Sequence, residues 1–234
     1  MPLKKTLIAL VPARKNSKGI KNKNLLFFRG ERIINRAIKI GLKLKAVEKV
    51  ILSTDSQKII NITKKFHKKI MVIKRNKKIA LDKTPMHPVL IDTVRKYEKD
   101  FKKKIDGVII LDPTSPLREK NDIDKCIKKF LFKKVDLLLT VHCSESNPYF
   151  SILEKGRKYF KLVKGEKLNI GSRQQAPKVF SINTICWIYS RKAILNSNLR
   201  IPKKTFIQEI DLKKTLELNL KMDKKKLSIY DKKK

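Results

Sequence analysis

Residues 7–25 read LIALVPARKNSKGIKNKNL, and this stretch decides the fold. It opens with an apolar run that is typical of a buried strand and continues as a polar loop rich in lysine and asparagine. In open α/β sheets, ligands bind beyond the carboxyl ends of the strands, and the first such loop commonly wraps a nucleotide. The stretch therefore predicts an α/β sheet with a ligand-binding loop after its first strand.

Short apolar runs alternate with longer amphipathic stretches along most of the chain. This rhythm predicts a Rossmann-like, open, mostly parallel sheet with helices on both faces. Asn121 is expected to cap a helix that begins at Asp122, and 224–234 is expected to be a basic tail. The expected strands are 7–12, 49–53, 71–73, 107–111, 136–141, 180–189 and 206–210, and the expected helices are 32–44, 56–66, 84–101, 122–132, 191–196 and 213–221.

The segment 144–178 interrupts this rhythm. It has no long helical period, and its prolines and glycines separate short apolar pairs. We expect hairpins that project from the sheet as a lid, a subunit interface or a loop. The aromatic side chains in it favour the interface; they are Tyr149, Phe150, Tyr159 and Phe160. We expect one domain over 1–234 that contains this insertion, with no linker.

Lysine and arginine number 59 and acidic residues 21, which gives a net charge of +38. So large a positive charge makes nucleic acid or an anionic membrane the first partners to consider. The lysines are spread over the whole chain, however, and spread charge is typical of a solvated surface. One Trp and five Tyr are few for a nucleic-acid face with interleaved aromatics. We expect no specific nucleic-acid partner and no membrane partner, with a basic nucleic-acid-binding protein as the alternative.

Other classes are excluded by spacing. Three cysteines and three histidines show no CxxC or HExxH pattern, which argues against a zinc site and a disulfide framework. The glycines form neither a GxGxxG nor a Walker pattern. Pro12 and Arg14 interrupt the first apolar run too early for a secretion signal, and no run approaches the roughly twenty residues of a membrane helix. With free thiols, these features predict a cytoplasmic protein.

The loop after the first strand combines cations with small polar residues. Its side chains and backbone amides can converge on a triphosphate without a Walker sequence. An ordinary exposed basic loop is the alternative. The candidates here are Arg14, Asn16, Ser17, Lys18, Gly19, Lys21 and Lys23.

Three later stretches also place polar groups at expected strand ends. Residues 111–118 (LDPTSPLR) form a rigid turn after a buried strand, where loops usually touch ligand. Residues 172–177 (SRQQAP), with Asn183, supply an arginine guanidinium that can bind a carboxylate through two hydrogen bonds, and they also supply several side-chain amides. These groups suit a polar, acidic substrate. Glu209 and Asp211 flank one strand residue and point the same way, so both carboxylates can face one Mg²⁺. Exposure to solvent without a ligand is the alternative for these acids.

In this order, the four stretches resemble the acylneuraminate cytidylyltransferases, which activate sialic acid and related nine-carbon keto sugar acids as CMP sugars. The resemblance runs over nearly the whole chain. Related enzymes for the eight-carbon acid Kdo usually end the first loop with Pro-Gly-Lys-Pro, which this chain lacks. The family's ARxxSKGIxxKN is matched at 13–24, its STD at 53–55, its LxPTSPLR at 111–118, its RQxxP at 173–177 and its late pair of metal acids at 209–211.

The resemblance implies a nucleotidyltransferase that converts CTP and a nonulosonic acid to the CMP sugar and pyrophosphate, with Mg²⁺ or Mn²⁺. It implies a homodimer in which 144–178 reaches towards the neighbouring active site. No histidine lies in a motif, so no side chain is assigned as general base. The implied roles are catalysis for Arg14, Lys23 and Asp211, nucleotide binding also for Ala13, Asn24, Arg75 and Ala80, acid binding for Asp112, Thr114, Ser115, Arg173, Gln174 and Asn183, and metal binding for Glu209 and Asp211.

Three positions depart from the family pattern. Asp112 stands where Gln is frequent, Thr184 where Gly often follows the Asn, and Glu209 where Asp is usual. These departures leave the identity of the acid open among sialic, legionaminic and pseudaminic types. A related transferase for a Kdo-like acid, or one that uses another nucleotide, remains the alternative.

Overall fold

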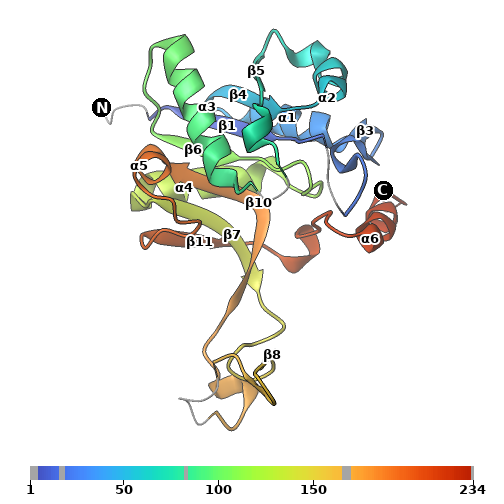
Figure 1. Cartoon of the computed structure of the whole chain (residues 1–234), viewed down its shortest axis with the longest axis vertical. Coiled ribbons are helices and arrows are strands. Elements are labelled where there is room, and N and C mark those ends of the chain that lie inside the picture. Colours follow the sequence, from blue (N-terminus) through green and yellow to red (C-terminus); the bar gives the residue numbers. More distant parts are fainter. Residues whose placement is uncertain (1–4, 16–18, 82–83, 165–169, 233–234) are drawn as a thin grey trace.

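The computed structural model describes residues 5–15, 19–81, 84–164 and 170–232. A seven-stranded sheet of β1 (Leu7–Pro12), β4 (Val47–Thr54), β5 (Ile70–Lys74), β6 (Gly107–Ile110), β7 (Leu137–Cys143), β10 (Phe180–Ser190) and β11 (Thr205–Glu209) forms its centre. The order is β11-β7-β10-β6-β1-β4-β5, in which only β10 runs antiparallel to its neighbours (Figure 1). The expected open, mostly parallel α/β sheet is confirmed.

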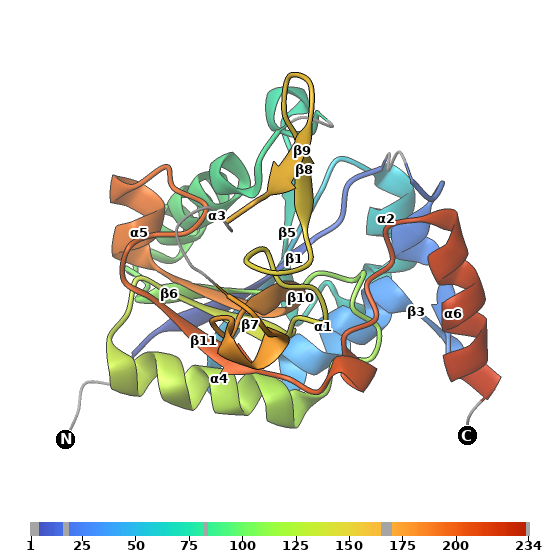
Figure 2. The ribbon, with the colours of Figure 1, turned by 90° about the horizontal axis from the view of Figure 1, so that it is seen from below.

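Helices cover both faces of this sheet, as expected (Figure 2). On one face lie α1 (Ile33–Lys43), α2 (Gln57–Ile62) and α4 (Lys120–Lys133), and on the other lie α3 (Met86–Phe101) and α5 (Arg191–Asn196). The alternation of a strand divides the core between the two faces. In β1, Leu7, Ala9 and Val11 pack on the α1 face, whereas Ile8 and Leu10 pack on the α3 face. Burial of β1 on both faces explains its continuous apolar run.

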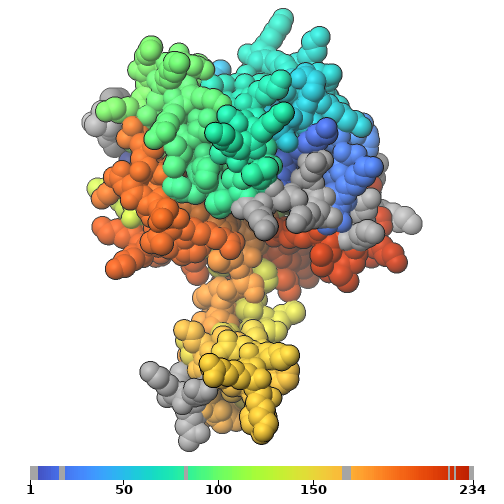
Figure 3. All heavy atoms as spheres, in the orientation of Figure 1, coloured from blue at the N-terminus to red at the C-terminus, as the bar shows by residue number. Residues whose placement is uncertain are grey.

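Two small hairpins extend the structure. The first pairs β2 (Phe27–Phe28) with β3 (Glu31–Arg32) through a turn in which Arg29 and Gly30 have positive φ. The second pairs β8 (Leu153–Lys155) with β9 (Phe160–Leu162) inside the insertion 144–178. The insertion hangs from the sheet on a narrow neck, which Figure 3 shows in outline. The expected projecting hairpin is therefore present.

The helix boundary expected at Asn121 is wrong. Helix α4 begins at Lys120, and Glu119 is its N-cap residue. Asp122 therefore lies in the first turn of the helix, where its carboxylate is 3.5 Å from the Nζ of Lys214. A carboxylate in the first turn also complements the positive end of the helix dipole.

The carboxyl-terminal elements also differ from the expectation. Residues 213–221 do not form a helix: a short 3-10 turn at Leu212–Lys214 is followed by extended chain, and α6 (Lys221–Lys232) occupies the expected basic tail. Leu216 and Leu218 alternate in this extended chain and both pack into one small apolar cluster, which also contains Leu227 of α6. The period of the apolar residues was therefore that of extended chain, and the lysines of α6 obscured its one apolar face.

The direction of β10 was also unexpected, because the sequence suggested that the parallel rhythm simply resumed. The chain returns from the insertion and pairs at once with β7, so it runs antiparallel to β7 and β6. As a result, the first residues of β10 lie at the edge where the parallel strands end, here called the carboxyl edge. Within the part of the chain that the structure describes, no helix has the length and apolarity to cross a membrane.

Candidate active site

The first residues of the loop after β1 are anchored at the carboxyl edge by two side chains. One comes from the segment after β4, and the other comes from the far end of the same loop. The backbone N–H of Lys15 donates to Oδ1 of Asp55 at 2.7 Å. The Nδ2 of Asn24 donates to the carbonyl of Arg14 at 3.1 Å. The nucleotide candidates Asn16, Ser17 and Lys18 lie outside the described residues. The backbone of Arg14 and Lys15 is thus fixed by hydrogen bonds.

Arg75 links the same loop to β4. Its Nε donates to Oγ of Ser53 at 3.2 Å and its Nη2 to the carbonyl of Ser53 at 3.0 Å. That carbonyl also accepts from the N–H of Ala13 at 2.9 Å. Burial lowers the pKa of Arg75, and the charge of Arg14 adds to this effect. The structure thus brings Arg75, Ala13 and Arg14 together, and Ala80 follows at the end of the next 3-10 turn.

The second half of the loop rests on the carboxyl-terminal segment. Nζ of Lys23 donates to the carbonyl of Leu218 at 3.4 Å. A Cβ placed on Gly19 would lie 1.9 Å from the carbonyl oxygen of Asn219, so only glycine fits at this position. Sequence reasoning gave this part of the chain no role in the site.

The 111–118 loop is closed on itself. Oδ1 of Asp112 accepts from the N–H of Thr114 at 3.1 Å and from its hydroxyl at 2.8 Å. The hydroxyls of Ser115 and Thr184 share a 2.7 Å hydrogen bond, which joins the loop to β10. The structure therefore brings these candidates together across two strands that the sequence separates widely.

The next candidate, Asn183, lies in a bulge of β10. Residues 183–186 face Thr140 alone, because the register with β7 shifts between Ile182 and Trp187. The Thr140 hydroxyl donates to Oδ1 of Asn183 at 2.6 Å, which fixes that amide. Asn183 is 3% exposed, and its Nδ2 has no hydrogen-bond partner among the described residues. A buried donor without a partner is costly, so this amide is a place where a ligand acceptor is favoured.

Arg118 holds this bulge in place by hydrogen bonds to its backbone carbonyls. Sequence reasoning assigned Arg118 no role in the site. It is 1% exposed, donates through Nε to the carbonyl of Ile185, and donates through Nη2 to the carbonyl of Thr184 at 2.8 Å. Burial lowers its pKa to about 10, although the charge of Asp112 opposes this effect. Its position at the end of the LDPTSPLR loop was the sequence feature that could have identified Arg118 as part of the site.

A cavity of about 330 Å³ opens beside the bulge, between α3 and β10. Its walls are largely apolar, and the guanidinium of Arg200 stacks over the Trp187 ring at 5.3 Å. Sequence reasoning identified Asp112 but not the rest of this lining, because no pattern joins α3, β10 and the loop after α5. The lining residues are Pro85, Met86, His87, Leu90, Ile110, Asp112, Thr184, Trp187, Tyr189, Asn198, Leu199 and Arg200.

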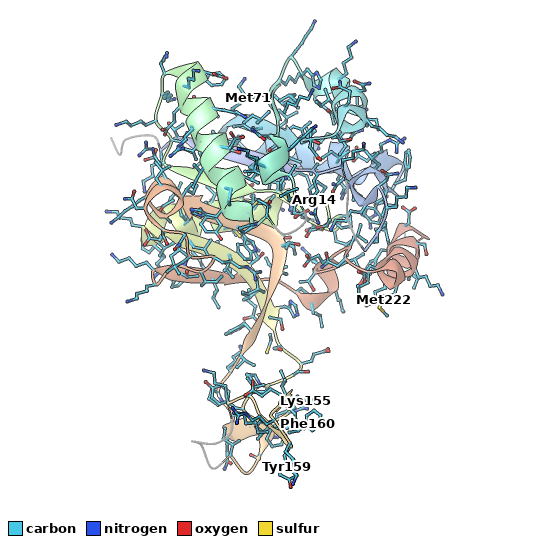
Figure 4. All side chains as sticks on the ribbon, in the orientation of Figure 1. Arg14, Met71, Lys155, Tyr159, Phe160 and Met222 are labelled. Carbon is cyan, nitrogen blue, oxygen red and sulfur yellow. The ribbon has the colours of Figure 1, made fainter. Side chains whose placement is uncertain are left out.

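Of the acid-binding candidates, Asp112 lines the cavity, and Asn183 is the chain neighbour of the lining residue Thr184, whereas Arg173 and Gln174 are not brought to it. Arg173 and Gln174 lie in a 3-10 turn of the insertion, and both are exposed. In Figure 4, Arg14 lies within the sheet body, whereas Tyr159 and Phe160 mark the far end of the insertion. No hydrogen bond among the described residues joins either candidate to Asn183.

The metal candidates lie at the carboxyl end of β11 and are both exposed. Oδ1 of Asp211 accepts from the N–H of Lys213 at 2.9 Å, and Oε2 of Glu209 is 4.0 Å from Nζ of Lys178. The described residues contain no group of three or more metal-binding side chains. Two carboxylates nevertheless fit Mg²⁺ when substrate phosphates complete the coordination, which is how this ion usually binds.

The open sheet and the anchored cationic loop at its carboxyl edge are those of a nucleotidyltransferase. The family model for cytidylyltransferases matches residues 8–231, and the chain belongs to this family. The flagellin modification protein B of Campylobacter coli is 30% identical over 93% of this chain and 91% of that protein. The CMP-N,N'-diacetyllegionaminic acid synthase of Campylobacter jejuni is 29% identical over the same shares. A solved CMP:2-keto-3-deoxy-manno-octonic acid synthetase in complex with CTP shares the fold, with a TM-score of 0.67 at 14% identity over 96% of this chain and 97% of that chain.

Proposed function

We propose that this cytidylyltransferase joins CTP to an N-acylated nonulosonic acid and releases pyrophosphate. The anomeric hydroxyl oxygen of the acid attacks the α-phosphorus of CTP in line. An oxygen–phosphorus bond forms to the acid as the bond from the α-phosphorus to the bridging oxygen of the β-phosphate breaks. The hydroxyl proton is released, and pyrophosphate leaves. The observation that carries the proposal is the largely apolar cavity between α3 and β10, which is lined by Asp112 of the 111–118 loop.

The cationic loop is the proposed CTP site. Arg14 and Lys23, with Asn16, Ser17, Lys18 and Gly19, supply cations and amides for the triphosphate, while Ala13, Asn24, Arg75 and Ala80 complete the nucleotide side. The anchoring of Arg14 through Asn24 supports this role, because a preorganised cation stabilises charge that develops in the transition state.

The cavity is the proposed acid site. Asn183 precedes the lining residue Thr184, and its unpartnered Nδ2 is the proposed donor for a carboxylate or hydroxyl of the acid, while Arg200 adds a cation at the cavity wall. Apolar walls from Leu90, Ile110 and Trp187 suit the methyl groups of N-acyl substituents. This lining favours legionaminic, pseudaminic or sialic acids over the polyhydroxylated, unacylated Kdo.

A divalent cation is proposed at Glu209 and Asp211. Mg²⁺ or Mn²⁺ there would neutralise phosphate charge and lower the pKa of a coordinated hydroxyl. The two side chains themselves supply oxygen ligands, and the hydrogen bond from the Lys213 N–H holds the Asp211 carboxylate in place. The nearby Lys178 of the insertion neutralises part of the acid charge when no cation is bound.

A homodimer in the cytoplasm is the proposed setting, with 1–234 acting as one domain. The insertion 144–178 carries exposed Tyr159 and Phe160, which suit a surface between subunits. Arg173 and Gln174 lie on this insertion, so a neighbouring subunit is the route by which they would reach an acid site. The cytoplasm supplies CTP and keeps Cys126, Cys143 and Cys186 reduced.

One assay tests the proposal. Purified protein is incubated with each nucleoside triphosphate, Mg²⁺ and one acid from a panel of diacetyllegionaminic, pseudaminic, N-acetylneuraminic and Kdo acids, and released pyrophosphate is measured. The expected result is turnover with CTP and with at least one N-acylated nine-carbon acid, and little with Kdo. Turnover with Kdo alone, or with UTP in place of CTP, would overturn the proposal.

A further inference from the structure

We propose that the carboxyl-terminal segment 216–231 is a brace that positions the cationic loop for CTP. The segment itself touches no substrate in this proposal, so its residues are positioning residues. The inference rests on the proposed role of the loop as the CTP site, and it adds a role for a part of the chain that carries none of the sequence motifs.

The brace contacts three residues of the loop. Ile20 is 2% exposed and packs in one cluster with Leu218 and Leu227. The carbonyl of Leu218 accepts from Nζ of Lys23 at 3.4 Å, which holds a candidate phosphate ligand. The carbonyl of Asn219 lies against Gly19 so closely that a methyl group would not fit between them. The second half of the loop therefore depends on this segment for its conformation.

The brace also contacts the loop of the acid site, but there it is one support among several. The N–H of Leu218 donates to the carbonyl of Thr114 at 3.0 Å. The same loop is held independently by the bonds of Thr114 to Asp112 and by the Ser115–Thr184 bond. Loss of the brace should therefore disturb CTP binding more than acid binding.

Within the brace, helix α6 holds residues 216–220 in place. Oδ2 of Asp223 accepts from the N–H groups of Asn219 and Leu220, at 2.8 and 2.6 Å, and so closes the corner between the extended chain and the helix. Leu227 is 5% exposed and packs against the cluster that contains Phe28. Met222, labelled in Figure 4, is 57% exposed on another face of the helix. The helix thus has one packed face, which carries Leu227.

The test compares two alanine variants of this helix in the full chain. Leu227→Ala removes the packed side chain, and Ile229→Ala removes a side chain that is 57% exposed and serves as the control. We expect Leu227→Ala to raise the KM for CTP about tenfold, because displacing a positioning element slightly can cost a hundredfold in rate. The KM for the acid should stay within about twofold, and Ile229→Ala should match the wild type in both. Equal KM values for CTP in the two variants would overturn the brace.

A second pair of variants separates positioning from general loss of structure. Leu227→Met retains apolar volume and should restore the KM for CTP, whereas Asp223→Asn weakens the corner and should raise it again. A parallel rise of both KM values with a lower melting temperature would mean that α6 only stabilises the fold, and would also overturn the brace. If Arg14→Ala leaves CTP binding unchanged, the proposed CTP site is wrong instead, which distinguishes the two failures.

Discussion

The sheet body and the insertion 144–178 differ in how far they bury their side chains. In the body, Arg118, Asn183 and Thr114 are each less than 4% exposed and bonded within one chain. In the insertion, Tyr159 is 72% and Phe160 is 67% exposed, and the short hairpin that carries them has little core beneath it. The body is therefore organised by its own contacts, whereas the insertion leaves these two aromatic side chains exposed.

The first prediction removes a cation from the body. Arg14→Ala should lower turnover at least about a hundredfold, because a positioned charge partner of the transition state is lost. Folding should survive, since Ala13 and Lys15 keep their backbone bonds to β4 and Asp55. Steady-state kinetics with CTP, together with the melting temperature, measure both effects. Normal turnover of a folded variant would remove Arg14 from the active site.

The second prediction tests whether the bulge in β10 is an organised part of the acid site. Thr140→Val removes the hydroxyl that bonds Asn183 and receives the N–H of Cys186 at 3.0 Å, without changing the side-chain shape. We expect the KM for the acid to rise about tenfold while the KM for CTP is unchanged, which corresponds to about 1.4 kcal/mol.

Thr93→Val is the control for this prediction. Thr93 is fully buried in α3 and donates to the carbonyl of Val89 at 2.7 Å, so its substitution also removes a buried hydroxyl. It should leave both KM values unchanged. If the two variants behave alike, the bulge has no special role in binding the acid.

The sheet was largely predictable because its strands are buried on both faces. The β1 prediction agrees with the observed Leu7–Pro12, and α5 agrees with Arg191–Asn196. The expected strand at 49–53 lies within the longer Val47–Thr54, because the charged Glu48 separates Val47 from the apolar run that follows. Continuous apolar runs leave few alternatives, whereas strand ends depend on pairing that a single sequence does not contain.

The site was predictable where one loop carries several groups and not where distant segments meet. The 13–24 and 111–118 loops were found because their cations, hydroxyls and prolines cluster in sequence. Arg200 and Met86 were missed because the cavity is lined by segments that lie far apart in the sequence. The same holds for the segment 216–231, in which Asn219 lies against Gly19 and Leu227 shares an apolar cluster with Ile20, far away along the chain.

The third prediction concerns the boundary between body and insertion, where Glu209 faces Lys178. Asp211→Asn should raise the Mg²⁺ concentration for half-maximal turnover severalfold, because an amide oxygen is a weaker ligand than a carboxylate. CTP binding without metal should change little. A magnesium titration of activity measures the shift, and Glu217→Gln, on the same carboxyl-terminal stretch, is the control. An unchanged titration would mean that Glu209 and Asp211 are ordinary exposed acids that bind no metal.

The fourth prediction concerns the insertion. Its expected effect is a change in the measured molecular mass of at most twofold, from dimer to monomer. We expect a homodimer at about 0.15 M salt, where the Debye length is roughly 8 Å and the +38 charge of each subunit is largely screened. Below about 0.02 M the screening length approaches 30 Å, so repulsion between subunits should loosen the dimer. Light scattering across this salt range measures the mass.

Substitutions at the exposed aromatics decide whether the insertion forms that interface. A standard interface buries on the order of 1,600 Å², and aromatic side chains at its centre contribute most of the binding energy. Tyr159→Ser with Phe160→Ser should therefore shift the protein to monomer at 0.15 M salt without lowering its melting temperature as a monomer, because neither side chain packs in the core of the body. Met222→Ser removes an apolar side chain of similar exposure from α6 and should leave the dimer intact. A monomer mass for the unmodified chain at micromolar concentration and 0.15 M salt would mean that the insertion is a lid or a loop, and that Arg173 and Gln174 do not act across a subunit interface.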